Sequence, residues 1–254
     1  IIATGAYERG VAFPGWTLPG VMSTGAVQTL LRSYRVAPGD RIVVAGNGPL
    51  NFQVAAELTD AGATVAAVVE AGTGPTLGTM SALFAGFRHT PDLMLDGLSY
   101  LRKLRRNGVP ILYQHVVTEA HGDTELKRVV VAPLAATGEP NAALRKEIEA
   151  DVVCVGLGFL PSNEVSRLLG CRHNFDPARA SLVVEKDKHC QTTVASVYVA
   201  GDCGGMGGAR VAIEEGFIAA CHAAEAIGSE AGLAEVILAR VEEGNLQLSI
   251  FKAQ

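Results

Sequence analysis

The sequence lacks several features that mark specialised protein classes. Its five cysteines include no Cys-x-x-Cys pair, so the ligand spacing of a zinc site, a thioredoxin-like dithiol or an iron–sulfur cluster is absent. No apolar run approaches the roughly 18 residues that a transmembrane helix needs. The chain carries a formal net charge of −5 and no basic run longer than residues 102–106, so nucleic acid is not an expected partner.

The amino-acid composition of the chain is that of a globular protein. The 254 residues are 48% hydrophobic and 19% charged, enough for a large core in one or two domains. The widely spaced cysteines predict reduced thiols in a cytoplasmic protein without a metal site. Ile1 and Ile2 are typical of a strand, with no signal peptide or initiating Met before them, which we interpret as the start of a fragment.

The most informative segment is the apolar run at residues 197–202, which ends in Gly201 and Asp202. A β-branched and aromatic run ending in glycine predicts a buried strand whose carboxyl end approaches a ligand. Glycine-rich residues 203–208 follow, and then an Ala-rich stretch at 209–226 with high helix propensity. This order aims a helix N-terminus at an anionic or electron-rich group beyond the strand. The alternative is a strand followed by an ordinary turn.

The middle of the chain predicts a βαβ unit. A buried strand at 40–45 runs into Gly46 and Gly48, a helix follows at 52–60, and a strand at 64–69 ends in Glu70. An acid about 24 residues after the first glycine has the spacing of a ligand for a ribose 2′-hydroxyl. A carboxylate there favours NAD over NADP, and the alternative is that Glu70 is an exposed residue at a strand end.

Two residues depart from the glycine-rich fingerprint of this unit. Its third position normally carries Gly or Ala so that helix and strand pack closely. Asn51 occupies that position, and it either pushes the helix outward or turns its amide into the ligand space. Pro49 removes an N–H that a pyrophosphate could use. A scaffold that has lost its ligand is therefore the alternative to nicotinamide dinucleotide binding.

Flanking patterns predict one parallel core with an antiparallel meander. Helices are expected at 23–34 with Ser23 or Thr24 as N-cap, at 92–106, and at 164–169 with Ser162 or Asn163 as N-cap. Strands are expected at 111–115, 127–132 and 152–155.

Together these motifs resemble the two-dinucleotide-domain flavoproteins of the pyridine nucleotide-disulfide oxidoreductase superfamily. Residues 197–202 resemble its C-terminal flavin fingerprint, and Ala3, Thr4 and Gly5 resemble its second flavin motif. Three further segments resemble the large flavoprotein subunits of opine oxidase, hydrogen cyanide synthase, dye-linked proline dehydrogenase and heterotetrameric sarcosine oxidase. These segments are residues 13–22, 158–164 and 168–171.

The resemblance implies an α/β fold with two dinucleotide-binding domains, a Rossmann-like parallel sheet with a β-meander, and a missing N-terminal part of the FAD domain. The expected divisions are 1–20 for the end of the first FAD-domain segment and the crossover, 21–158 for an NAD(P)-type domain, 159–230 for the returning FAD-domain segment and 231–254 for a C-terminal extension. The first glycine-rich flavin fingerprint and a cysteine-rich cluster-binding region are absent, which we interpret as truncation at both ends.

The resemblance also implies cofactor contacts. Asp202 would hydrogen-bond the ribityl chain of FAD, and the helix that begins near Gly208 would point at the pyrimidine end of the isoalloxazine. The implied FAD contacts are Ala3, Thr4, Gly5, Gly201, Asp202, Gly207, Gly208 and Ala209. The contacts of a second dinucleotide, NAD(P), are Gly46, Gly48, Pro49, Asn51 and Glu70. No catalytic residue is assigned, because the flavin would carry the chemistry.

We therefore expect an FAD-dependent oxidoreductase subunit that passes electrons from an amine or amino-acid-type substrate to an acceptor, beside a partner flavoprotein subunit. The fragment alone is expected to be inactive. The alternatives are a self-contained NAD(P)H-dependent flavin reductase and a non-catalytic nucleotide-binding module, because fold alone does not separate them. Trp16, the single tryptophan, either packs under a domain junction or faces a partner subunit.

Overall fold

The computed structural model describes residues 1–74 and 91–228, so the predicted extension at 231–254 lies outside the described part. The chain divides into two compact units. Unit 1 comprises Ile1–Tyr7 and Phe159–Gln254, and unit 2 comprises Glu8–Gly158. Among the described residues, no helix is long and apolar enough to cross a membrane.

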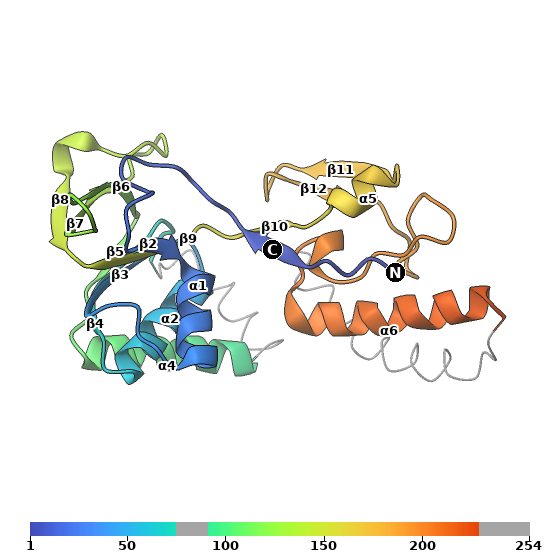
Figure 1. Cartoon of the computed structure of the whole chain (residues 1–254), viewed down its shortest axis with the longest axis horizontal. Coiled ribbons are helices and arrows are strands. Elements are labelled where there is room, and N and C mark those ends of the chain that lie inside the picture. The colour runs from blue at the N-terminus through green and yellow to red at the C-terminus, as the bar shows by residue number, and fades with distance from the viewer. Residues whose placement is uncertain (75–90, 229–254) are drawn as a thin grey trace. The chain divides into compact units, whose positions relative to one another are not determined.

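Unit 2 is built on a five-stranded parallel sheet with the strand order β2-β9-β3-β4-β5 (Figure 1). Its register pairs Gly46 with Glu70 on one side and with Gly156 on the other. The carboxyl ends of three strands therefore meet at one edge, where open parallel sheets bind ligands. The strands are β2 (Val21–Ser23), β3 (Arg41–Gly46), β4 (Thr64–Glu70), β5 (Ile111–Tyr113) and β9 (Val152–Gly156).

Both faces of this sheet are covered, which explains why β3 is an unbroken apolar run. Ile42 and Val44 pack with the helices on one face, whereas Val43 and Ala45 pack with an antiparallel meander on the other. The helices are α1 (Thr24–Thr29), α2 (Pro49–Asp60) and α4 (Pro91–Arg106), and the meander consists of β6 (His115–His121), β7 (Arg128–Pro133) and β8 (Lys146–Glu149), with the 3₁₀ turn η3 (Ala142–Leu144) between its last two strands.

Two predicted elements of unit 2 differ from the structure, in each case where the backbone becomes irregular. Ser23 caps α1 as predicted, accepting the Ala26 N–H at 3.2 Å. The helix expected to run to residue 34 changes instead to the π-helix η1 (Leu30–Tyr34). The strand expected at 111–115 is broken at Gln114, whose φ of 55° is incompatible with an extended chain.

Unit 1 is organised around the long helix α6 (Gly208–Ala226) and a buried extended segment beside it. The strand predicted at 197–202 is shorter than expected, because Val199 pairs with Ile2 only as an isolated parallel bridge. Its side chains nevertheless alternate as in a strand. Tyr198 and Ala200 pack in the same cluster as the α6 residues, and Val199 packs with Ile2.

Short elements complete unit 1, including a hairpin that the sequence did not reveal. Asn163 occupies the N-cap position of α5, but its side chain donates to the Leu182 carbonyl oxygen of the hairpin at 2.9 Å, so the predicted side-chain cap is wrong. The elements are β1 (Ala6–Glu8) paired with β10 (Phe159–Pro161), α5 (Glu164–Leu168), the hairpin of β11 (His173–Asp176) and β12 (Ser181–Val184), and the 3₁₀ turn η4 (Asp202–Gly204).

Candidate functional site

Asp202 lies before α6 and closes the glycine-rich loop that leads into it. Its Oδ1 accepts the N–H of Gly207 at 2.9 Å and that of Gly208 at 2.8 Å. Gly201, the preceding residue, has a φ of 78°, and a Cβ there would lie 3.1 Å from the Cβ of Ala212. Glycine is therefore required at this position by both its backbone conformation and the closeness of α6.

The N-terminal segment runs beside this loop. The Ile2 N–H donates to the Tyr198 carbonyl at 2.8 Å, and the Ala200 N–H donates to the Ile2 carbonyl at 3.0 Å. Because parallel neighbours advance in the same direction, Ala3 follows this pairing toward the same edge as Gly201. The structure thus brings together the first and last segments of unit 1.

Ser162 ties the N-terminal motif to a third segment. Thr4 Oγ1 donates to the Ser162 carbonyl oxygen at 2.6 Å, and the Ser162 N–H donates to the Gly5 carbonyl at 2.9 Å. Sequence reasoning considered Ser162 only as a helix cap. Its hydroxyl donates to the Glu164 carboxylate at 3.3 Å, and the contacts to Thr4 and Gly5 use Ser162 backbone atoms, for which the sequence carries no signal.

The backbone at this edge is compatible with the FAD contacts that the sequence resemblance implies. Gly5 and Gly208 have φ values of 72° and 80°, and a Cβ at either position would meet nothing within 4 Å. Bare backbone therefore faces open space at both glycines. The first-turn N–H groups of α6 that Asp202 does not occupy, from Ala209 onward, have no partner within the helix. Such a terminus stabilises negative charge by about 0.3–2 kcal/mol, which suits the pyrimidine end of a reduced flavin.

The cysteines are packing residues. All five lie in the described part of the chain, where they are buried and form no disulfide with one another. Cys203, which follows Asp202, is fully buried, and its Sγ lies 3.2 Å from the Ala200 carbonyl oxygen. Burial raises the pKa of the Cys154 thiol to about 12. Within the described residues, no group of three or more His, Cys, Asp or Glu side chains is arranged to hold a metal ion.

Asn51 adopts neither of the two arrangements that the sequence predicted. It is 1% exposed, its Nδ2 donates to the Gly156 carbonyl oxygen at 3.0 Å, and its Oδ1 accepts the Thr24 hydroxyl at 3.0 Å. A Cβ on Gly46 would lie 1.9 Å from the Gly156 carbonyl oxygen, and one on Gly156 would lie 2.5 Å from Asn51 Oδ1. The amide therefore fills space that two glycines leave, inside the protein and not in the ligand space.

Glu70 is also buried, with 5% exposure, so the alternative of an exposed strand-end residue is wrong. Its Oε2 accepts the Gly48 N–H at 3.1 Å, and its Oε1 accepts the Gly72 N–H at 2.8 Å. Burial raises the pKa of Glu70, although both hydrogen bonds act in the opposite direction. Gly48 has a φ of 108° and open space at its Cβ position, and Pro49 begins α2 without an N–H. The Gly48 backbone therefore borders open space at this turn, and its N–H donates to the buried Glu70 carboxylate.

Sequence reasoning did not single out Lys186 and Glu215. Glu215 is 7% exposed on α6, and its Oε2 accepts both the Lys186 ammonium at 2.6 Å and the Gly201 N–H at 2.9 Å. The sequence signal that could have identified Glu215 was an acidic residue within an Ala-rich helix. Glu214 beside it is the same residue type, so composition did not show which of the two faces inward.

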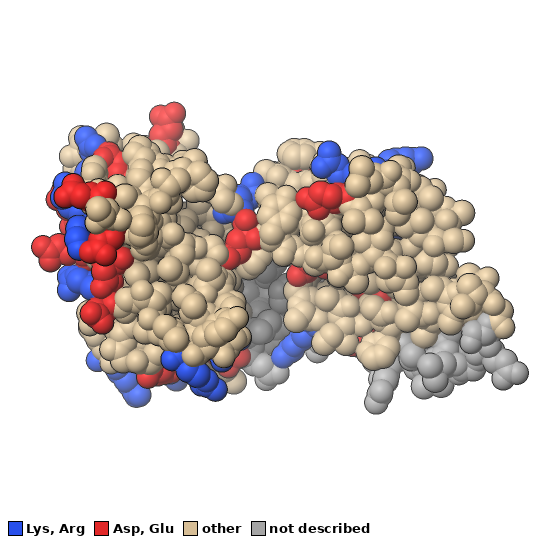
Figure 2. All heavy atoms as spheres, viewed as in Figure 1, with Lys and Arg blue, Asp and Glu red and all other residues tan. Residues whose placement is uncertain are grey.

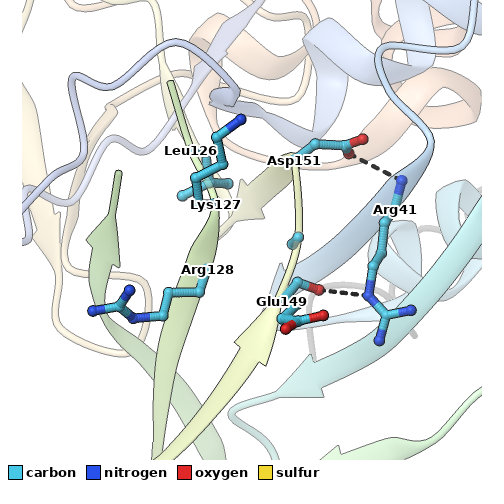
Figure 3. Close-up of a pocket in the computed structure, with 7 residues that line it drawn as sticks. Arg41, Leu126, Lys127, Arg128, Glu149 and Asp151 are labelled. Atoms are coloured by element: carbon cyan, nitrogen blue, oxygen red, sulfur yellow. Dashed lines mark hydrogen bonds between the residues drawn. The ribbon is translucent and has the colours of Figure 1, made fainter. Parts of the chain in front are cut away.

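A hollow of about 440 Å³ opens where the parallel strands of unit 2 begin, at the edge opposite the glycine turn (Figure 3). Asp151 Oδ1 accepts the Arg41 N–H at 3.0 Å, and Arg41 Nε donates to the Glu149 carbonyl oxygen at 2.8 Å. Arg41 begins β3, Glu149 ends β8 and Asp151 directly precedes β9, so these bonds join the sheet to the meander, and we do not place the site there. The lining residues are Arg41, Leu126, Lys127, Arg128, Glu149, Ala150 and Asp151.

A parallel sheet with an outward-facing glycine turn, and a second unit with a Gly-Asp edge at a helix N-terminus, define an α/β protein with the architecture of the dinucleotide-binding folds. Residues 1–216 match the family described as pyridine nucleotide-disulphide oxidoreductase, and the chain belongs to this family. The resemblance seen in the sequence is thereby confirmed.

Several curated proteins are similar over most of the chain. HcnB, part of the hydrogen cyanide synthase of Pseudomonas aeruginosa, is 40% identical over 220 residues, which are 87% of this chain and 47% of HcnB. An opine oxidase subunit from Rhizobium meliloti (strain 1021) is 35% identical over 90% of this chain and 48% of its own length. The alpha subunit of sarcosine oxidase from Corynebacterium sp. (strain P-1) is 30% identical over 91% of this chain and 21% of its own length. The chain thus spans about half the length of the first two relatives.

Solved structures confirm the predicted fold class. Thioredoxin reductase of T. acidophilum superposes with a TM-score of 0.60 at 21% identity, covering 89% of this chain and 65% of that one. L-proline dehydrogenase of P. horikoshii superposes with a TM-score of 0.57 at 16% identity, covering 94% and 37%. At such identities the likeness concerns the fold alone.

Proposed function

We propose that this chain is the FAD-holding part of an oxidoreductase subunit that passes electrons from an amine or amino-acid-type substrate to an acceptor. The observation that carries the proposal is the Gly201–Asp202 edge, where a carboxylate accepts the N–H groups at the start of α6 and the preceding segment pairs with Ile2, which leads into Ala3, Thr4 and Gly5. Family membership supports it. Relatives named opine oxidase and sarcosine oxidase support the substrate class, since opines and sarcosine are amines of the amino-acid type.

In this proposal the chain binds and orients the cofactor. FAD supplies the electron-accepting ring when bound. Asp202 keeps Oδ2 outside its two hydrogen bonds to Gly207 and Gly208, so that this oxygen accepts from a ribityl hydroxyl. Gly5 and Gly208 allow close approach, and the amides from Ala209 onward favour negative charge on the ring.

Unit 2 would hold a second dinucleotide, NAD(P), at its glycine turn. Gly46 and Gly48 open the turn, and the Glu70 carboxylate lies directly behind it. Pro49 leaves this turn with fewer N–H donors than a complete fingerprint. The missing Pro49 N–H therefore favours the alternative, in which unit 2 keeps the scaffold but binds no nucleotide. Titration with NADH and NADPH decides between binding and no binding.

The division into an FAD-type and an NAD(P)-type domain is part of the proposal, as is a cytoplasmic location with reduced thiols. A partner flavoprotein subunit is proposed because the relatives are themselves named as subunits. Unit 1 also exposes large apolar side chains on α5 and β11, including Leu168 and Phe175. Figure 2 shows charged groups of both signs along the left and lower edges of unit 2 and fewer of them on the visible surface of unit 1.

The test compares Asp202→Ala with Asp202→Asn in the intact protein, by stripping FAD and measuring its rebinding. Asparagine keeps an oxygen that caps α6 but loses the carboxylate, so the pair separates capping from cofactor binding. We expect Asp202→Ala to weaken FAD binding by one to two orders of magnitude, since a lost hydrogen bond is worth about 1–3 kcal/mol. Asp176→Asn, on β11, is the control. Unchanged flavin content in Asp202→Ala would contradict the proposal.

A further inference from the structure

Lys186 and Glu215 form an ion pair inside unit 1. The side chains are 15% and 10% exposed, and Lys186 Nζ lies 2.6 Å from Glu215 Oε2. The same oxygen accepts the Gly201 N–H at 2.9 Å. A buried ion pair contributes little to stability on its own, because desolvation offsets the attraction between the charges. Its position directly behind the Gly201–Asp202 edge points to another role.

The Gly201 N–H has few other acceptors within reach. Successive N–H groups of an extended chain point in opposite directions, and the Ala200 N–H already donates to Ile2. The Gly201 N–H therefore faces α6, where Glu215 Oε2 accepts it. Without this oxygen a buried donor would remain unpaired at the residue before Asp202.

Lys186 orients this carboxylate and also lies against the loop. A Cβ on Gly204 would lie 2.9 Å from Lys186 Nζ, so the ammonium occupies the space beside that glycine. The glycine-rich loop is thus hydrogen-bonded at its start to Glu215 and at its end to Asp202 through the Gly207 and Gly208 amides, and Lys186 lies against its middle at Gly204.

We propose that Glu215 and Lys186 are positioning residues of the flavin edge: they fix the Gly201–Asp202 peptide so that the Asp202 carboxylate faces the cofactor. This inference rests on the proposed FAD site. It assigns a function to a charge pair that touches neither substrate nor cofactor.

Three variants of the intact protein separate positioning from simple stabilisation. Glu215→Gln keeps an acceptor for Gly201 but leaves the Lys186 ammonium unpaired. Glu215→Gln with Lys186→Met keeps the acceptor and removes the ammonium. Glu215→Leu with Lys186→Met removes both charges and the acceptor, replacing them with apolar groups of similar size. Arg172→Gln, in the exposed Arg172–Glu185 pair of the same unit, is the matched control.

Two quantities are measured for each variant: the dissociation constant of FAD for the stripped protein and the melting temperature of that stripped protein. We expect Glu215→Gln to bind FAD about tenfold more weakly than wild type, and the Gln/Met double variant to recover most of that loss. The Leu/Met double variant should melt near the wild-type temperature, because removing two desolvated charges offsets the loss of the Gly201 acceptor. It should still bind FAD about tenfold more weakly, because that loss leaves the Gly201–Asp202 peptide unfixed.

Wild-type FAD affinity in the Leu/Met variant would overturn the inference, since the pair would then act only through stability. If that variant does not fold, the FAD dissociation constants of the two variants that carry Glu215→Gln provide the test. Wild-type FAD affinity in Glu215→Gln then overturns the inference. Asp202→Ala distinguishes the two proposals. Weak binding in Asp202→Ala with unchanged binding in the Glu215 variants defeats the positioning role alone, whereas unchanged binding in Asp202→Ala defeats the FAD site itself.

Discussion

Asn51 and Gly156 are joined by a hydrogen bond of 3.0 Å from the asparagine amide to the glycine carbonyl, which ties the first turn of α2 to the carboxyl end of β9. Gly46 and Gly156 create the space for this amide by having no side chains. The glycine turn therefore keeps close helix–strand packing with an asparagine at a position where glycine or alanine is usual.

Asn51→Ala should lower the free energy of unfolding of unit 2 by about 2–3 kcal/mol. The Gly156 carbonyl and the Thr24 hydroxyl would both lose a buried partner. Urea denaturation followed by circular dichroism measures the change. Gln53→Ala, on the same helix, is the control and should have a much smaller effect, because the Gln53 amide donates within the helix to Glu57 Oε1 and not to a distant segment. A change equal to that of the control would show that the amide's contacts are not structural.

The stability of unit 2 should depend on the protonation of Glu70. Burial raises its pKa above the ordinary value of 4.5, so the folded protein binds this proton more tightly than the unfolded chain does. The resulting stabilisation is complete below the unfolded pKa and is lost as pH rises through the folded pKa. Between about pH 4 and about pH 7, wild type should therefore lose more free energy of unfolding than Glu70→Gln does.

Denaturation curves of wild type and Glu70→Gln at several pH values test this prediction. Glu147→Gln, an exposed glutamate of the meander, controls for the loss of one carboxylate from the same unit. A constant difference between wild type and Glu70→Gln across the range would show that burial does not raise the pKa of Glu70.

If unit 2 binds a nicotinamide dinucleotide, Glu70 should favour NADH over NADPH by about tenfold or more, through a charge-assisted hydrogen bond to the ribose and repulsion of the 2′-phosphate. Fluorescence titration of the intact protein with each nucleotide gives the two dissociation constants. Glu70→Gln should reduce the preference, and equal affinities in wild type would remove Glu70 from nucleotide selection. Because the Asn51 amide lies outside the ligand space, Asn51→Gly should not create binding where wild type shows none.

Trp16→Ala should lower the melting temperature of the intact protein by several degrees without preventing assembly with a partner subunit. The loop packs on the meander through Phe13 and Leu18, while Trp16 remains 50% exposed on this chain. Leu18→Ala, which removes packing within unit 2, is the comparison for a purely internal effect. A Trp16→Ala protein with unchanged stability that no longer co-purifies with its partner would place Trp16 in the interface.

The sequence by itself determined the local elements that carry the candidate sites. Strand β3, helix α2, strand β4 and the terminal Glu70 follow from side-chain periodicity and glycine placement, both of which depend only on neighbouring residues. The long helix α6 behind Asp202 follows from its Ala-rich composition in the same way. The motifs at residues 197–202 and 3–5, taken together with three further segments, indicated the family, which the match over residues 1–216 confirmed.

Only the tertiary structure decided where polar side chains point. Asn51 finds its acceptor 105 positions away at Gly156, and the Gly201 N–H finds Glu215 on a helix two turns beyond the loop. The hairpin of β11 and β12 was missed because its short strands are only half buried and carry weak alternation. A buried polar group takes whichever partner the packed fold presents, and that partner is set by contacts between distant segments that no local pattern encodes.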